Sequence, residues 1–139
     1  MISVKGLYKD FGSLHILKGV SCEVQKGEKV VLIGPSGSGK STLLRCVNQL
    51  EAPTFGEIWM DGKLLTAPDP YLHFDIIRLS ETYGKLVASG MGDEAAIAKI
   101  KAEDLLRSRE GKAYRSALRE IEKANRINID AARQKMGMV

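Results

Sequence analysis

The sequence predicts an α/β fold with antiparallel strands at the N-terminus and an inserted helical segment. Residues 2–24 contain two runs with the apolar content of strands, and both precede a glycine-rich loop. An apolar, β-branched run at 30–33 enters that loop, and a helix-compatible run leaves it. Residues 67–128 place apolar side chains at helical spacing. Together these patterns predict a sheet packed against helices, with a separate helical segment.

The N-terminal residues predict two strands and a turn. The first strand covers Ile2–Leu7 and the second covers Leu14–Val24. Between them, Phe11 stands directly before a turn glycine, Gly12. Further on, Asp61-Gly62 predicts a tight hairpin turn within the alternating run 57–65. Trp59 of that run is expected to be a packing residue rather than a second platform for a base.

The most informative motif is the pattern G-x-x-x-x-G-K-[S/T], which defines a P-loop. Its residues, with the one that follows, are Gly34, Pro35, Ser36, Gly37, Ser38, Gly39, Lys40, Ser41 and Thr42. Glycines let the backbone curl until successive N–H groups face phosphate oxygens, and the following helix dipole adds positive potential. We expect Lys40, the candidate catalytic residue, to reach the β- and γ-phosphates, and the Ser41 hydroxyl to coordinate Mg²⁺. The flanking strand and helix patterns disfavour the alternative of a flexible Gly/Ser turn.

Composition narrows the class of protein. The net charge is +4, but both signs are interspersed, which favours a solvated surface over a nucleic-acid partner. Cys22 and Cys46 lack metal-ligand spacing and are expected to be small buried residues, while His15 and His73 stand alone. The N-terminus has no signal-peptide pattern, and no apolar run approaches the ~18 residues of a membrane helix. These features predict a cytosolic protein whose membrane contact, if any, runs through a partner.

The segments around the P-loop form a succession that resembles a known family. They are Gly6–Gly12, Leu17–Ser21, Lys26–Glu28, Leu43–Ile58, Asp61-Gly62 and Ile129–Val139. The first of these closely resemble the N-terminal part of ABC transporter ATPases. Those after the P-loop are similar to importers of polar amino acids, and the last resembles the strand before the glutamine loop of that family. The resemblance covers residues 1–66 and about 128–139.

The resemblance implies a fold, cofactors and partners. It implies an ABC-type ATP-binding domain that binds ATP and Mg²⁺, with Phe11 stacking on adenine; the alternative for Phe11 is a core aromatic at a strand end. It also implies a second ATP-binding subunit, completing a dimer, and a permease subunit at the membrane. The protein is then expected in the cytoplasm, peripheral to the inner membrane through that permease.

The resemblance also divides the chain. Residues 1–66 are expected to form the N-terminal part of the ATP-binding domain, 67–128 a helical insert, and 129–139 a return strand truncated before the glutamine loop. Within the insert we expect one helix that ends at Ser89-Gly90, a second from an Asp93 N-cap to about Arg109, and a third through 114–124.

Several family motifs are absent from the sequence. It has no LSGGQ-type signature, no apolar run ending in Asp-Glu and no switch histidine in the right part of the chain. We therefore expect part of a longer importer subunit that binds ATP but hardly hydrolyses it alone. Two alternatives stay open: a standalone nucleotide-binding module that acts through its helical insert, and another P-loop enzyme such as a kinase.

Overall fold

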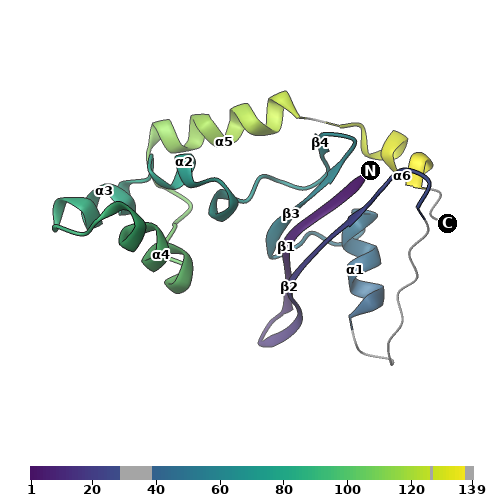
Figure 1. The fold of residues 1–139 in the computed structure, drawn as a ribbon, viewed down its shortest axis with the longest axis horizontal. Coiled ribbons are helices and arrows are strands. Elements are labelled where there is room, and N and C mark those ends of the chain that lie inside the picture. The colour runs from purple at the N-terminus through teal and green to yellow at the C-terminus, as the bar shows by residue number, and fades with distance from the viewer. Residues whose placement is uncertain (29–38, 126, 137–139) are drawn as a thin grey trace. The chain divides into compact units, whose positions relative to one another are not determined.

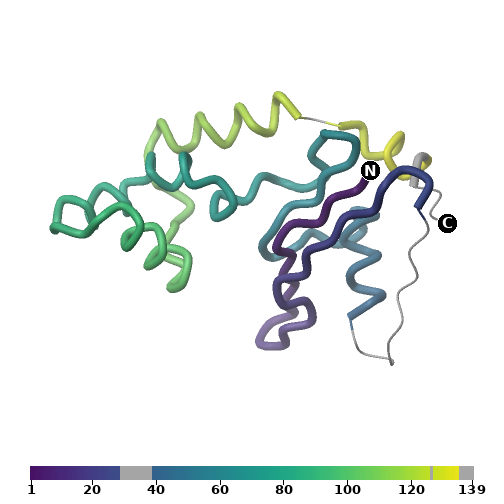
Figure 2. The backbone as a smooth tube through the Cα atoms, in the orientation of Figure 1, coloured from purple at the N-terminus to yellow at the C-terminus, as the bar shows by residue number. Residues whose placement is uncertain are grey.

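The computed structural model describes residues 1–28, 39–125 and 127–136. Its elements are β1 (Ile2–Phe11), β2 (Leu14–Val24), α1 (Lys40–Val47), β3 (Phe55–Met60), β4 (Lys63–Leu64), η1 (Pro70–Leu72), α2 (Phe74–Ile77), α3 (Glu81–Ala88), α4 (Asp93–Glu103), α5 (Lys112–Ala124) and α6 (Ile129–Met136) (Figure 1). The chain divides into two compact units, and the backbone of both is traced in Figure 2. Unit 1 comprises Met1–Pro68 and Asn125–Val139, and unit 2 comprises Asp69–Ala124. None of the helices in the described ranges combines the length and the apolar character needed to span a membrane.

The described strands of unit 1 form an antiparallel sheet in the order β2-β1-β3-β4. Both predicted N-terminal strands are confirmed, and the first continues to Phe11. The predicted turn is also confirmed, since Asp61 and Gly62 have φ values of 50° and 76° and join β3 to β4. Positive φ at both central residues is the geometry of a type I′ hairpin turn. The expected strand at 30–33 lies outside the described residues.

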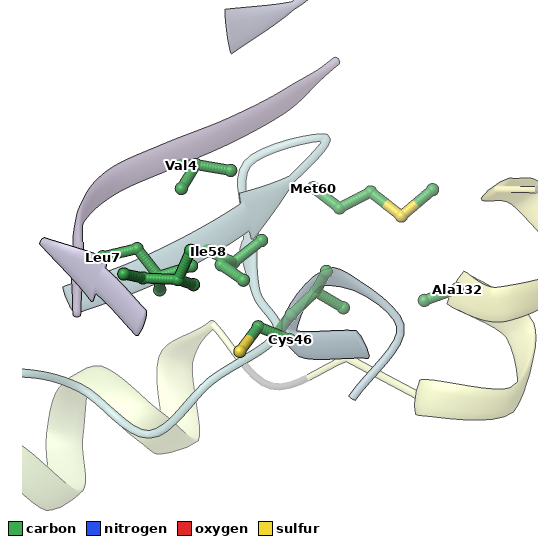
Figure 3. Close-up of a cluster of buried hydrophobic side chains, with 8 residues drawn as sticks. Val4, Leu7, Cys46, Ile58, Met60 and Ala132 are labelled. Atoms are coloured by element: carbon green, nitrogen blue, oxygen red, sulfur yellow. The ribbon is translucent and has the colours of Figure 1, made fainter. Parts of the chain in front are cut away.

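The core of unit 1 lies between the sheet and two helices. Figure 3 shows Val4, Leu7, Ile58 and Met60 from the sheet, Cys46 from α1 and Ala132 from α6. Leu7, Cys46 and Ile58 are each 0% exposed, so the expectation of a buried Cys46 is confirmed. The same expectation for Cys22 is wrong, because Cys22 lies exposed on β2, an edge strand of the described sheet. This core attaches the helix that follows the P-loop to the sheet.

The predicted return strand at 129–139 is wrong for its described part, because Ile129–Met136 forms the helix α6. The physical reason is local. Ala131, Ala132 and the residues after them are strong helix formers, and the Asn128 side chain accepts a hydrogen bond from the Ala131 N–H as an N-cap. Arg133 then donates from Nε to the Asn48 carbonyl at 2.9 Å, just beyond the end of α1. The Asn128 cap stabilises the start of α6, and Ala132 and Arg133 hold the helix to the rest of unit 1.

Unit 2 is helical, but its helices begin and end differently from the sequence prediction. The single helix expected before Ser89-Gly90 is broken into α2 and α3, because Ser80 is extended and its side chain accepts a hydrogen bond from the Tyr83 N–H. Helix α4 has Gly92 rather than Asp93 as its N-cap, and it ends at Glu103 because Asp104 adopts a left-handed conformation. The third predicted helix is confirmed as α5.

The core of unit 2 is small and aliphatic. Ile77, Ile97 and Ile100 form its buried centre, each at most 6% exposed. Aromatic and leucine side chains from η1, α3 and the segment after α4 pack around this centre. Residues from distant parts of the unit therefore share one hydrophobic cluster.

Candidate nucleotide-binding site

The described part of the P-loop is its last stretch, from Gly39 to Thr42, where α1 begins. Gly34, Pro35, Ser36, Gly37 and Ser38 lie outside the described residues. Gly39 has a φ of +91°, and a Cβ atom there would lie 3.1 Å from the Ile16 carbonyl oxygen and from Leu17 Cδ2. The left-handed backbone and the close approach to β2 both favour glycine at this position. The motif glycine therefore brings the start of α1 against the sheet.

The N-terminus of α1 has the properties of an anion site. No side chain caps it, and its first turn contains no acidic residue. Ser41 is exposed, while Lys40 and Thr42 are half-buried. The first backbone N–H groups of a helix have no partner within the helix, and the dipole makes this end positive. A phosphate group matches that donor set, and the exposed Ser41 hydroxyl matches a ligand of Mg²⁺.

Phe11 ends β1 in the same unit, and its side chain is 46% exposed. It is therefore not a core aromatic, although its proposed stacking role stays a prediction. The Lys9 ammonium lies over the ring, 5.0 Å from its centroid. Lys9 and Phe11 are two residues apart on a strand, so their side chains share a face. Sequence analysis missed Lys9, and the two-residue spacing was the available signal.

Trp59 of β3 is engaged by its neighbours. Its Nε1 donates a hydrogen bond to Glu57 Oε1 at 3.1 Å, and the Lys5 ammonium lies 5.4 Å from its ring centroid. The side chain is half-buried. These contacts fit the packing role expected for Trp59.

Shifted pKa values in unit 2 have causes inside the unit. Hydrogen bonds from Arg78 and Tyr83 lower the pKa of Asp93 to about 2. Burial raises the pKa of Tyr114 to about 12. Burial opposes the charge of Glu110, but hydrogen bonds from Thr82 and Arg107 outweigh it and hold the Glu110 pKa below its ordinary value. The bonds of Asp93 and Glu110 therefore connect parts of unit 2, and the Tyr114 shift reflects its burial there.

Burial raises the pKa of the Cys46 thiol in unit 1. Only the thiolate is a good nucleophile. Cys46 is therefore a packing residue and not a reactive one.

A glycine-rich loop that leads into an uncapped helix beside a sheet defines a P-loop domain of α/β class. The profile of the ABC transporter family matches residues 17–138. The chain therefore belongs to the ABC transporter family, as the resemblance predicted.

The related proteins include ATP-binding proteins of amino-acid importers. The L-cystine import ATP-binding protein TcyN of Bacillus subtilis (strain 168) is 50% identical over 70 residues, which are 50% of this chain and 27% of TcyN. The glutamate transport ATP-binding protein GluA of Corynebacterium glutamicum is 34% identical over 131 residues, which cover 92% of this chain and 54% of GluA. The dimeric structure of MJ0796, a bacterial ABC transporter cassette, is 34% identical over 59% of this chain and 37% of that one, with a TM-score of 0.47. The chain spans between about a quarter and a half of the length of these two curated relatives.

Proposed function

We propose that this chain binds ATP and Mg²⁺ through its P-loop and is part of the ATP-binding subunit of an amino-acid importer. The observation that carries the proposal is the N-terminus of α1, where Gly39-Lys40-Ser41-Thr42 begins a helix without a side-chain cap or an acidic first turn. TcyN and GluA are named for cystine import and glutamate transport, and this similarity supports an amino acid as the cargo.

Each motif residue has a proposed role. The backbone N–H groups of 34–39 and of the first turn of α1 hold the phosphates, and Lys40 pairs with the β- and γ-phosphate oxygens. Ser41 supplies a hydroxyl to Mg²⁺, and Phe11 stacks on the adenine ring. Bound Mg²⁺ neutralises the charge that develops on the phosphates.

Efficient hydrolysis belongs to the whole subunit rather than to this chain alone. The sequence has neither the Asp-Glu pair at the end of an apolar run nor a signature motif. Phosphoryl transfer depends on positioned charges and an oriented water, so binding without those groups gives little turnover. In the intact importer, a second ATP-binding subunit and a membrane permease are the proposed partners, which places the protein in the cytoplasm, peripheral to the inner membrane.

Isothermal titration calorimetry of the full chain with ATP–Mg²⁺ tests the proposal. Lys40→Ala should remove most of the affinity for ATP and less of that for ADP, because the γ-phosphate contact is lost. Phe11→Ala should weaken ATP and ADP equally, since stacking does not involve the γ-phosphate. Lys26→Ala is the matched control, because it removes one exposed lysine of unit 1 outside the motif. Equal loss of both nucleotides in Lys40→Ala would contradict the assigned geometry.

A second candidate is a standalone nucleotide-binding module whose working part is the helical insert, proposed for residues 67–128. One observation favours it: unit 2, Asp69–Ala124, has its own aliphatic core around Ile77, Ile97 and Ile100. In that case, removal of unit 2 would abolish the cellular activity while nucleotide binding stayed intact. If the chain is instead part of an importer subunit, disruption of the P-loop should abolish transport.

A further inference from the structure

Lys9 and Phe11 reverse the usual distribution of charged and aromatic side chains. The Lys9 side chain is only 14% exposed, whereas Phe11 is 46% exposed. Lysine is almost never buried without a partner, and an aromatic ring gains free energy when it leaves water. A largely buried lysine beside an exposed ring therefore needs specific partners.

The contacts of Lys9 explain its burial. Its Nζ donates a hydrogen bond to the Ala52 carbonyl at 2.7 Å and lies 3.6 Å from Glu51 Oε2. Both partners belong to the loop that follows α1, the helix that starts at the P-loop. The same ammonium lies over the Phe11 ring, 5.0 Å from its centroid. Lys9 thus joins the far end of the P-loop helix to the exposed aromatic.

Two further hydrogen bonds connect β1 to the loop after α1. The Asp10 N–H donates to Thr54 Oγ1 at 2.9 Å, and the Thr54 N–H donates to the Tyr8 carbonyl at 2.8 Å. The backbone on both sides of Lys9 is therefore attached to the loop after α1. The Phe11 side chain can still rotate, and the Lys9 ammonium over its ring restricts that rotation.

We infer that Lys9 is a positioning residue for the nucleobase: its ammonium covers one face of the Phe11 ring and holds the other face ready for stacking. The inference rests on the proposed function, because it gives Phe11 the base as its ligand. Cation–π attraction is electrostatic, and it orders the ring before the base arrives, which reduces the entropy lost on binding. Every base has a π-face, so this arrangement favours a nucleotide over the bare phosphates without selecting adenine over another base.

The test compares ATP with inorganic tripolyphosphate, which has the phosphates but no base, in calorimetric titrations of the full chain with Mg²⁺. Lys9→Met keeps the aliphatic stem and removes the ammonium. It should weaken ATP about threefold to tenfold and leave tripolyphosphate within about twofold, as expected for a cation–π contact. Lys9→Arg should restore ATP affinity, because a guanidinium also lies well over an aromatic face. Lys18→Met, at an exposed lysine opposite Tyr8 on β2, is the control with the same loss of charge.

A Phe11→Leu background separates positioning from a general structural role. Adding Lys9→Met to Phe11→Leu should cause no further loss of ATP affinity if Lys9 acts through the ring. Equal weakening of ATP and tripolyphosphate by Lys9→Met, or an unchanged ATP affinity, would overturn the inference while the P-loop assignment stood. A chain that binds neither ATP nor tripolyphosphate would overturn the proposed function, and this inference with it.

Discussion

Units 1 and 2 differ in how some of their polar and aromatic side chains are engaged. In unit 2, Glu110 accepts hydrogen bonds from the Thr82 N–H and Oγ1 at 2.9 Å and from the Arg107 N–H at 3.0 Å, although it is 1% exposed. Asp93 is likewise paired with Arg78 and Tyr83. In unit 1, the first turn of α1 has no side-chain cap, and Phe11 is turned to solvent. These polar groups of unit 2 bond to one another, whereas in unit 1 the start of α1 has the properties of an anion site and the Phe11 ring is exposed.

The largest expected effect is a loss of stability confined to unit 1, caused by Gly56→Ala. Gly56 has a φ of +99°, and a Cβ atom there would lie 2.5 Å from the Gly6 carbonyl oxygen and 2.7 Å from Leu7 Cα, which are backbone atoms. Gly56→Ala should lower the free energy of unfolding of unit 1 by about 4 kcal/mol, from left-handed strain and steric overlap between β1 and β3. Residue-resolved hydrogen exchange should show the loss of protection in β1–β4.

Gly62→Ala is the control for that variant, because Gly62 has a φ of +76° but nothing within 4 Å of a Cβ atom. It should cost about 1 kcal/mol, from backbone strain alone. A similar cost for both alanines would show that β1 and β3 do not approach as closely as described.

The second largest effect is a loss of stability in unit 2 on Glu110→Gln, with unit 1 still folded. Glu110→Gln keeps the shape of the side chain but replaces one carboxylate oxygen with an NH2 group, which cannot accept a hydrogen bond, so either the Thr82 N–H or the Arg107 N–H loses its acceptor. We expect a loss of about 2 kcal/mol in the free energy of unfolding, since a buried donor is left without an acceptor. Glu122→Gln, at an exposed residue of α5, removes the same charge and should change it by less than about 0.5 kcal/mol. Urea unfolding followed by hydrogen exchange measures both, and equal costs would contradict the bonding described for Glu110.

The smallest effect is a pH dependence confined to unit 2. Glu110 and Asp93 both have pKa values below their ordinary ones in the folded protein. Their stabilisation is therefore complete above the ordinary carboxyl pKa of about 4, and is lost as pH falls through the pKa values of the folded protein. For Asp93 that loss extends to about pH 2.

Unfolding of unit 2 measured from pH 6 to pH 2 should show stability falling below about pH 4. Combining Glu110→Gln with Asp93→Asn should flatten the slope, because neither replacement side chain titrates. The control is Glu122→Gln, whose slope should match that of the unaltered chain. An unchanged slope in the double variant would assign the acid sensitivity to other groups.

Features that depend on neighbouring residues were predictable from the sequence. The Asp61-Gly62 turn requires positive φ at two consecutive positions, and these residue types tolerate it. The periodic run of α5 and the two N-terminal strands were also clear. Ser80 was a local signal that we overlooked, since a serine before an acidic residue is a common helix start. For 129–136, the family resemblance predicts a strand and the residue types favour a helix, and the described residues form the helix.

Features that depend on distant contacts were not predictable. The Glu110 carboxylate meets Thr82 across 28 residues, and Lys9 meets Ala52 across 43. No local pattern specifies either pair, because a charged residue is expected at the solvent-exposed surface when only the sequence is known. The candidate site could be predicted as a motif, and the two-residue spacing was a local signal for the Lys9–Phe11 contact, but the Lys9–Ala52 bond was not predictable.

The most direct test of the account is an NMR titration of the full chain with ATP–Mg²⁺, which records backbone amide shifts residue by residue. We predict large shifts at Gly39, Lys40, Ser41 and Thr42, a smaller set around Phe11, and none at the Thr82 and Arg107 amides that Glu110 accepts from. Lys40→Ala should remove the first set. Shifts concentrated in Asp69–Ala124, with the start of α1 unmoved, would contradict the claim that unit 1 contains the nucleotide site.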